Sequence, residues 1–96
     1  MNNVPNISRL MAIARRREQR ERDISILRDY LAGMKRADIA KKYGLSRSTI
    51  HYLADRLVRQ HASSDKYPER RLPDDIEARL KELEALQTAL KALQIP

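Results

Sequence analysis

Apolar residues recur every three or four positions along most of the chain, a spacing that gathers them on one face of a helix. Five stretches show this pattern, and they are residues 7–14, 23–32, 36–43, 46–60 and 74–95. No stretch alternates apolar and polar residues in the manner of a strand. The sequence therefore predicts an all-α fold.

The first two helical stretches are separated by RRREQRERD, residues 15–23, which contains no apolar residue but favours helix by propensity. Two arrangements stay open at this stage, one long helix or two helices with a break near residue 22. The basic segment is either a solvated connecting helix or an arm that lies along phosphates.

Helix ends are marked by residues with suitable chemistry. Asn6 and Ser46 each precede a helical stretch, where a side-chain oxygen can accept a hydrogen bond from a free backbone amide. Gly33 and Gly44 each follow one, where glycine adopts the left-handed conformation at little cost. Asp74, with Glu77 three residues later, is an acidic variant of the capping box.

These signals divide the chain into four parts. We expect an N-terminal basic helical arm over 1–22, a three-helix domain over 23–60, a linker over 61–73 and a C-terminal helix over 74–95. The linker prediction rests on the two prolines, two serines and mixed charge of HASSDKYPERRLP.

Residues 36–55, RADIAKKYGLSRSTIHYLAD, predict two short helices that cross steeply around a tight turn. Ala40 is small where the second helix passes close to it. Gly44 takes positive φ in the turn, where a Cβ atom would cost about 1 kcal/mol. Ile39 and Ile50 lock the two helices together from their facing sides. This pattern favours a helix-turn-helix.

Composition and charge limit the possible partners. The net charge is +7, and residues 1–72 hold 17 basic and 8 acidic residues while residues 73–96 hold 3 and 5. A basic excess of this kind favours a polyanion, usually nucleic acid. The chain has no Cys, Phe or Trp, so its core must be built from Leu, Ile and Ala and will be modest. A domain this small gains stability from oligomerisation.

The stretch around Gly44 resembles the helix-turn-helix DNA-binding superfamily. Similar sequences occur in homeodomain-like transcriptional regulators, serine-recombinase C-terminal domains, transposase N-terminal domains and phage small terminase subunits. The resemblance covers about residues 23–60 and rests on Ala40, Gly44 and Ile50 at matching spacing. Lys35 is a departure, because many relatives have a capping Ser or Thr there.

The resemblance implies that the helix after Ser46 is a recognition helix, whose N-terminal residues meet base edges in the major groove. The side chains then expected to contact bases are Arg47, Ser48, Thr49, His51 and Tyr52. Those expected to contact phosphates are Arg36, Lys41, Lys42, Ser46 and Arg56. Arg47 is the best candidate for bidentate contact with guanine, which contributes about 1–3 kcal/mol of discrimination.

The C-terminal helix has a heptad-like apolar seam that is too apolar to leave in water. Its members are Ile76, Leu80, Leu83, Leu86, Leu90 and Leu93. We expect this seam to form a homodimer, and the alternative is that the helix folds back on its own domain. A twofold dimer would bind an inverted repeat of double-stranded DNA whose half-site centres lie about 34 Å apart, or a multiple of it.

Together these features predict a sequence-specific DNA-binding transcriptional regulator. The alternative is a phage DNA-packaging protein similar to a small terminase subunit, or a recombination accessory protein. We expect no enzymatic activity, cofactor or metal, because neither paired carboxylates, nor a phosphate-cradling glycine loop, nor a ligand cluster is present. We also expect a cytoplasmic protein, since no apolar stretch reaches membrane-spanning length and the N-terminus lacks the order of a secretory signal.

Overall fold

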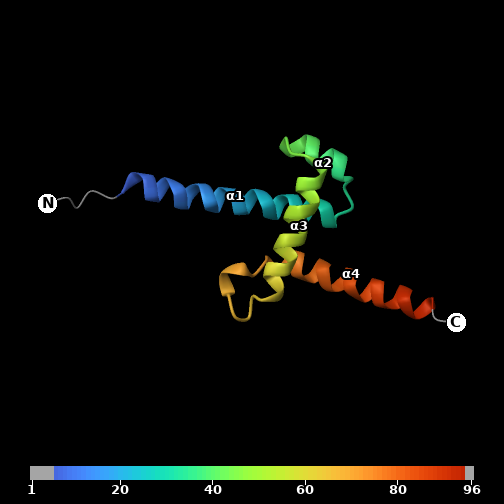
Figure 1. The fold of residues 1–96 in the computed structure, drawn as a ribbon. Coiled ribbons are helices and arrows are strands. Elements are labelled where there is room, and N and C mark those ends of the chain that lie inside the picture. The colour runs from blue at the N-terminus through green and yellow to red at the C-terminus, as the bar shows by residue number, and fades with distance from the viewer. Residues whose placement is uncertain (1–5, 95–96) are drawn as a thin grey trace.

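The computed structural model describes residues 6–94, which form four α-helices and no strand. The helices are α1 (Ile7–Leu31), α2 (Arg36–Tyr43), α3 (Arg47–Ala62) and α4 (Asp74–Leu93), with a short 3₁₀ helix, η1 (Pro68–Arg70), before α4. The all-α prediction is confirmed for this part of the chain. Figure 1 shows α2 and α3 at the centre, with α1 and α4 projecting to opposite sides.

The first helix is continuous through the basic segment, so the choice left open by the sequence is resolved in favour of one long helix. Asn6 caps it as predicted, because its side-chain oxygen accepts a hydrogen bond from the Arg9 amide at 3.2 Å. Only the C-terminal half of α1 packs against other helices, and residues 7–19 are exposed. The predicted boundary near residue 22 therefore marks where packing begins, within an unbroken helix.

The two glycines end their helices as predicted. Gly33 has φ +94° after α1, and Gly44 has φ +67° after α2, both in the left-handed region. Ser46 caps α3, because its hydroxyl accepts a hydrogen bond from the Thr49 amide at 3.2 Å. Lys35, the departure from the resemblance, gives α2 no side-chain cap. The tight connection between α2 and α3 thus has the local geometry that its residues predict.

The acidic capping box predicted at Asp74 is wrong. The helix begins at Asp74 itself, and the preceding Pro73 offers no side chain that caps a backbone amide. The first turn of α4 instead holds three carboxylates, Asp74, Asp75 and Glu77. These negative charges compensate the positive end of the helix dipole, which is a second way to stabilise the same terminus.

The core consists of two neighbouring clusters that meet at the crossing of α1 with α3. One cluster joins α1, α2 and α3 and contains Ile26, Ile39, Ala40, Ile50 and Leu53. The other joins α1, α3 and the start of α4 and contains Leu27, Ala54, Leu57, Leu72 and Ile76. Tyr43 and Leu45 pack against the first cluster from the α2–α3 connection. As the composition predicts, Ile, Leu and Ala make up the whole of this core.

The segment predicted as a linker is a packed loop. Leu72 is 2% exposed within the second cluster, and its backbone amide donates a hydrogen bond to His61 Nδ1 at 3.0 Å. Arg70 Nη1 donates to the Ser63 hydroxyl at 3.0 Å and closes the loop across η1. The sequence analysis did not predict this packing, because one buried leucine among polar residues produces no periodic signal.

Two of the six residues assigned to a dimer seam belong to the chain's own core. Ile76 is 2% exposed in the second cluster, and Leu80 packs against that cluster. Arg28 fixes the start of α4 by donating to both carboxylate oxygens of Asp75, at 2.9 and 3.3 Å. The first turns of α4 therefore fold back on the domain, and only the later turns stay open to a partner.

We predict that Leu72→Ala lowers the free energy of unfolding by about 2–5 kcal/mol, because it leaves a cavity in the second cluster. Met34→Ala, at an exposed side chain between α1 and α2 that lies in neither projecting arm, is the control and should change it by less than about 0.5 kcal/mol. Urea unfolding followed by circular dichroism measures both. Equal effects of the two substitutions would show that residues 61–73 are the unpacked linker that their composition suggests.

Candidate functional site

The candidate site lies on α3, whose two faces differ in chemistry. One face is buried in the core through Ile50, Leu53, Ala54 and Leu57. The opposite face begins with Arg47 and Ser48 and continues with His51 and Tyr52, all of them exposed. The burial of the first face fixes the direction in which the second points. Four of the five predicted base-contacting residues are thus brought together on one accessible surface.

Thr49, the fifth, has a different position. It is half-buried, and its hydroxyl lies 2.7 Å from the Ser46 hydroxyl, which also lies 3.2 Å from that of Ser48. These three hydroxyl groups form a hydrogen-bonded cluster around the N-cap of α3. Ser46 and Thr49 therefore have a structural role in starting the helix, whatever else they contact.

Tyr52 is the most prominent apolar side chain on this surface, with 62% of its area exposed. The Arg56 guanidinium lies 5.8 Å from the centre of its ring, within the range of a cation–π contact. One turn further along, Asp55 forms an ion pair with Arg59. An exposed aromatic ring flanked by a cation has the chemistry to contact a flat base or a methyl group.

Of the residues predicted to contact phosphates, Arg36 and Lys41 are exposed on α2 and form no ion pair with the described residues. Lys42 instead reaches back to α1, where its Nζ atom lies 2.9 Å from Asp29 Oδ2. The Tyr43 hydroxyl donates to the same oxygen at 2.9 Å. Asp29 thus ties α2 to α1, and the sequence analysis did not predict this internal partner of Lys42.

The pKa values of this group shift with its contacts. The hydrogen bond from Lys42 lowers the pKa of Asp29, and the Tyr43 hydroxyl lowers it further. The same contact with Asp29 raises the pKa of Lys42. Burial raises the pKa of Tyr43, and its hydrogen bond to the carboxylate adds to the rise. All three shifts favour the ordinary charge states of these groups at neutral pH, with Asp29 ionised, Lys42 protonated and Tyr43 neutral.

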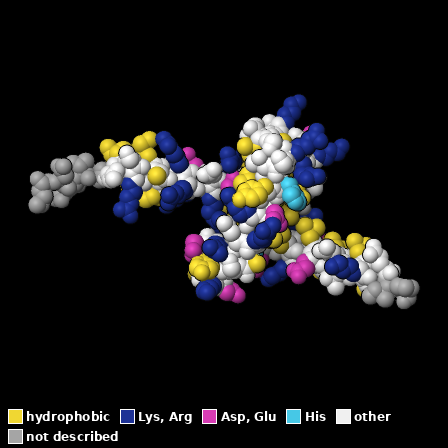
Figure 2. Space-filling view, in the orientation of Figure 1, with side chains coloured by type: hydrophobic (Ala, Val, Ile, Leu, Met, Phe, Trp, Pro, Cys, Tyr) yellow, Lys and Arg dark blue, Asp and Glu magenta, His cyan; other side chains and the backbone are white. Residues whose placement is uncertain are grey.

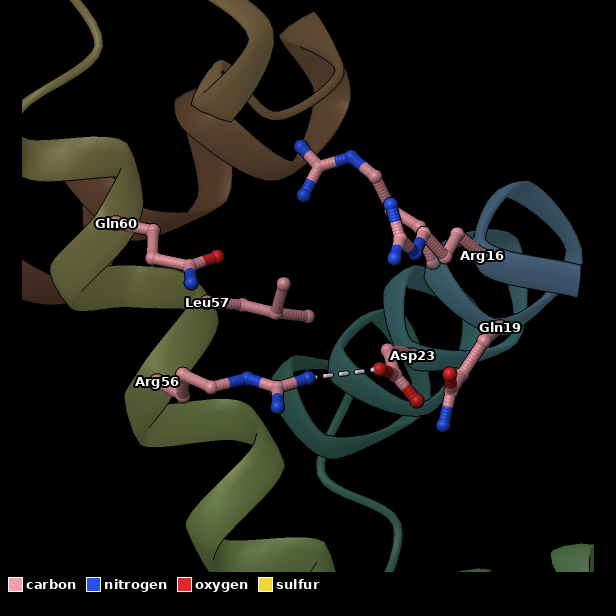
Figure 3. Close-up of a pocket in the computed structure, with 7 residues that line it drawn as sticks. Arg16, Gln19, Asp23, Arg56, Leu57 and Gln60 are labelled. Carbon is pink, nitrogen blue, oxygen red and sulfur yellow. Dashed lines mark hydrogen bonds and ion pairs between the residues drawn. The ribbon is translucent and has the colours of Figure 1, made fainter. Parts of the chain in front are cut away.

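Arg56, also predicted to contact phosphate, has an internal partner as well. Its Nη2 atom lies 3.0 Å from Oδ2 of Asp23 (Figure 3). Arg22 Nη2 lies 3.0 Å from Oδ1 of the same carboxylate. Asp23 is the one charged residue in the described part of the chain that is buried, at 2% exposed. Its ion pair with Arg56 connects α1 directly to α3. Arg56 therefore stabilises the helix crossing, a role that the sequence analysis missed.

Basic side chains cover two regions of the surface. Figure 2 shows Lys and Arg along the N-terminal part of α1 and around α2. Acidic side chains lie mainly toward the loop after α3 and the start of α4, in agreement with the uneven charge along the sequence. The N-terminal end of α3, which begins with the exposed Arg47, consequently lies close to the positive charges of α2.

Among residues 6–94, no group of His, Asp and Glu side chains is arranged to hold a metal ion. None of the four helices is both long and apolar enough to cross a membrane, as far as the described residues extend. Comparisons of the chain with protein-family models, with curated proteins and with solved structures gave no match.

The shifted pKa of Asp29 predicts how stability depends on pH. Since its pKa in the folded protein lies below the ordinary value of 3.8, the unfolded chain takes up a proton first as the pH falls. The contribution of Asp29 is therefore fully present above its ordinary pKa and is lost as the pH drops through the lowered one. At neutral pH we expect Asp29→Asn to cost about 1 kcal/mol, because the pair is partly exposed.

Urea unfolding of wild type and of D29N, repeated at steps from about pH 6 to about pH 3, measures this effect. The difference between the two proteins should shrink toward the acid end. Asp65→Asn, at an exposed turn residue that pairs with no described residue, is the control and should show no such trend. A constant difference between wild type and D29N would contradict the assignment.

Proposed function

We propose that this protein binds double-stranded DNA in a sequence-specific manner, with α2 and α3 acting as a helix-turn-helix in a dimeric transcriptional regulator. The observation that carries this proposal is the exposed set Arg47, Ser48, His51 and Tyr52, held on one surface by the buried face of the same helix. The left-handed turn at Gly44 and the cap at Ser46 support it, because they join two short helices with almost no intervening chain.

The dimensions and the charge of α3 suit the major groove. This groove is about 12 Å wide and admits an α-helix, and recognition helices present their N-terminal residues to base edges. Arg47 is the first residue of α3, so its guanidinium can approach guanine without obstruction from the core. Arg36 and Lys41, exposed on α2, are placed to contact the flanking phosphates.

We predict that Arg47→Ala and Lys41→Ala weaken DNA binding in different ways. Loss of Arg47 should remove about 1–3 kcal/mol of discrimination at one base position, because a bidentate base contact disappears. Loss of Lys41 should weaken binding to all sequences equally and reduce the slope of log affinity against log salt by about 1. Selection from random duplexes, followed by titrations at several salt concentrations, measures both effects.

Lys91→Ala, in the exposed last turn of α4, is the control for loss of one positive charge. It should leave both the preferred sequence and the salt slope unchanged. If R47A and K41A have the same effect on every duplex, base recognition by α3 is ruled out. If the wild type binds no duplex even at low salt, the whole proposal fails.

Dimerisation would use the last three turns of α4. After Ile76 and Leu80 are committed to the core, the remaining seam consists of Leu83, Leu86, Leu90 and Leu93, the last three being 53%, 58% and 82% exposed. This seam is shorter than the predicted one. A dimer built on it would place one copy of α3 on each side of a twofold axis, and would match an inverted repeat.

We predict that Leu86→Glu combined with Leu90→Glu produces a monomer, because two charges then occupy the centre of the seam. Ala85→Glu combined with Ala92→Glu adds the same charges to another face of the same helix, and should preserve the dimer. Sedimentation equilibrium gives the mass of each variant. A monomeric wild type, or dissociation by both pairs of substitutions, would exclude the seam as the interface.

A second candidate function, in DNA packaging or recombination, is favoured by one further observation. The N-terminal half of α1 carries its own exposed apolar side chains, Ile7, Leu10, Met11 and Ile13, on the opposite side of the molecule from α4. Two separate apolar surfaces per chain are what a head-to-tail ring requires. A mass of more than four copies in the same sedimentation experiment would favour this candidate over the dimeric regulator.

A further inference from the structure

An open cavity of about 170 Å³ lies between α1 and α3, beside the buried ion pair of Asp23 (Figure 3). It is separate from the base-contacting residues, since its walls come from the C-terminal half of α3 and the basic segment of α1. The polar side chains that line it are Arg16, Gln19, Arg20 and Asp23 from α1 and Arg56 and Gln60 from α3. With about 30 Å³ for each water molecule, the cavity has room for a small tetrahedral anion and its hydration.

The charges around this cavity do not cancel. The two oxygens of Asp23 are already engaged by Arg22 and Arg56, so its negative charge is compensated within the fold. Arg20 donates from Nη2 to the carbonyl oxygen of Arg71 at 3.2 Å, which orients its guanidinium but leaves the charge in place. Arg16 has no hydrogen bond or ion pair with residues 6–94. Two guanidinium charges thus remain without a counter-charge.

Arg56, which lines the cavity, also has an unmet hydrogen-bond donor. The Nε atom of Arg56 is buried and has no acceptor, which holds for no other buried side-chain nitrogen or oxygen in the described part of the chain. A buried donor without a partner costs free energy, so such groups usually indicate a missing ligand or water molecule. Gln60 adds an amide group at the rim.

The helical spacing of the residues that line the cavity keeps them on the facing sides of α1 and α3. Arg16, Arg20 and Asp23 follow at intervals of four and three along α1, and Arg56 and Gln60 follow at an interval of four along α3. Residues at these intervals share a helix face, so the crossing of α1 and α3 turns the two faces toward each other. An anion between them would relieve the repulsion of the guanidinium groups and accept their hydrogen bonds.

We propose that this cavity binds a phosphate group. Guanidinium forks match the geometry of phosphate oxygens, and three arginines, Arg16, Arg20 and Arg56, line this cavity. The group could be a backbone phosphodiester of DNA or a free phosphate, and the two sources share this chemistry. Binding of free phosphate is independent of the proposed function, whereas binding of the DNA backbone rests on it.

The position of the cavity favours the DNA backbone. Arg47 and Arg56 are nine residues apart on α3, which at 1.5 Å per residue corresponds to about 13.5 Å. This length is close to the major-groove width of about 12 Å. Nine residues are also two and a half turns, so Arg56 and the neighbouring cavity lie on the other side of α3 from Arg47. With Arg47 at the base edges, the cavity would therefore face a phosphate strand that borders the helix, away from the bases.

The test uses the full-length protein and inorganic phosphate, with chloride replacing it at constant ionic strength. We expect saturable binding in an amide-shift titration, with the shifts centred on residues 16–23 and 56–60. Arg16→Gln combined with Arg20→Gln should weaken this binding about tenfold or more. Arg9→Gln combined with Arg17→Gln removes two charges from the exposed part of α1 away from the cavity, and should leave it within about twofold.

The second arm measures DNA affinity of both pairs of variants at several salt concentrations. A salt slope reduced by about 1–2 in R16Q/R20Q but not in R9Q/R17Q identifies the ligand as a backbone phosphate. Phosphate binding with equal slopes in both pairs identifies a free phosphate. Gln60→Glu, which brings a negative charge to the rim, should weaken phosphate binding without altering the ion pair of Asp23.

Absence of saturable phosphate binding, or an equal loss in both pairs of variants, overturns the proposal. The outcome is distinguishable from failure of the proposed function. If no duplex binds while phosphate titrates the cavity, sequence-specific DNA binding fails and the phosphate site stands. If duplexes bind with an Arg47-dependent preference while phosphate does not titrate the cavity, sequence-specific DNA binding stands and the phosphate site fails.

Discussion

The crossing of α1 with α3 is the contact on which the rest of the molecule depends. Ile26 and Leu27 are adjacent on α1 and both 0% exposed, yet each belongs to a different half of the core. Ile26 packs toward α2, and Leu27 packs toward Leu72 and the start of α4. One turn of α1 therefore contributes to both halves of the core, as α3 does through Ile50 and Leu53 in one half and Ala54 and Leu57 in the other. The ion pair between Asp23 and Arg56 joins the same two helices one turn earlier.

The small size of this core follows from the composition of the chain. With no Phe or Trp, each buried contact is made by Ile, Leu or Ala, and ten such residues form the core of the described chain. A core of that size organises about three turns of each long helix and no more. The first half of α1 and the later turns of α4 are left exposed as projecting arms (Figure 1). Both arms keep apolar stripes that the domain cannot cover, which supports the proposal that other copies of the chain cover them.

Periodic features could be predicted from the sequence, and isolated ones could not. The bounds of α2, both left-handed glycines and the caps at Asn6 and Ser46 follow from local spacing and residue chemistry. Leu72 escaped notice because a single buried residue in a polar loop has no period. The internal partners of Lys42 and Arg56 escaped because ion pairs across 13 and 33 residues leave no local trace. One signal in the sequence could have predicted the cavity. Arg16, Arg20, Asp23 and Leu27 follow at helical spacing, which places two arginines of the basic run on the same face of α1 as the buried Asp23 and Leu27.

The division of basic residues between internal and external partners changes how the charge of +7 should be understood. Three basic side chains form ion pairs within the fold, namely Arg28 with Asp75, Lys42 with Asp29 and Arg56 with Asp23. Their main role is therefore to stabilise the helix arrangement. Positive charges left without such partners lie along the exposed N-terminal part of α1, at the first turn of α3, on the outer face of α2 and in the cavity between α1 and α3. The charge of the first turn of α3 lies at the N-terminal end of that helix, with the α2 charges alongside. The cavity lies toward the C-terminal end of α3. A polyanion that followed this path would meet α3 along its length, and a compact anion would meet only the cavity. This distribution of charge supports the proposal that the ligand is an extended polyanion.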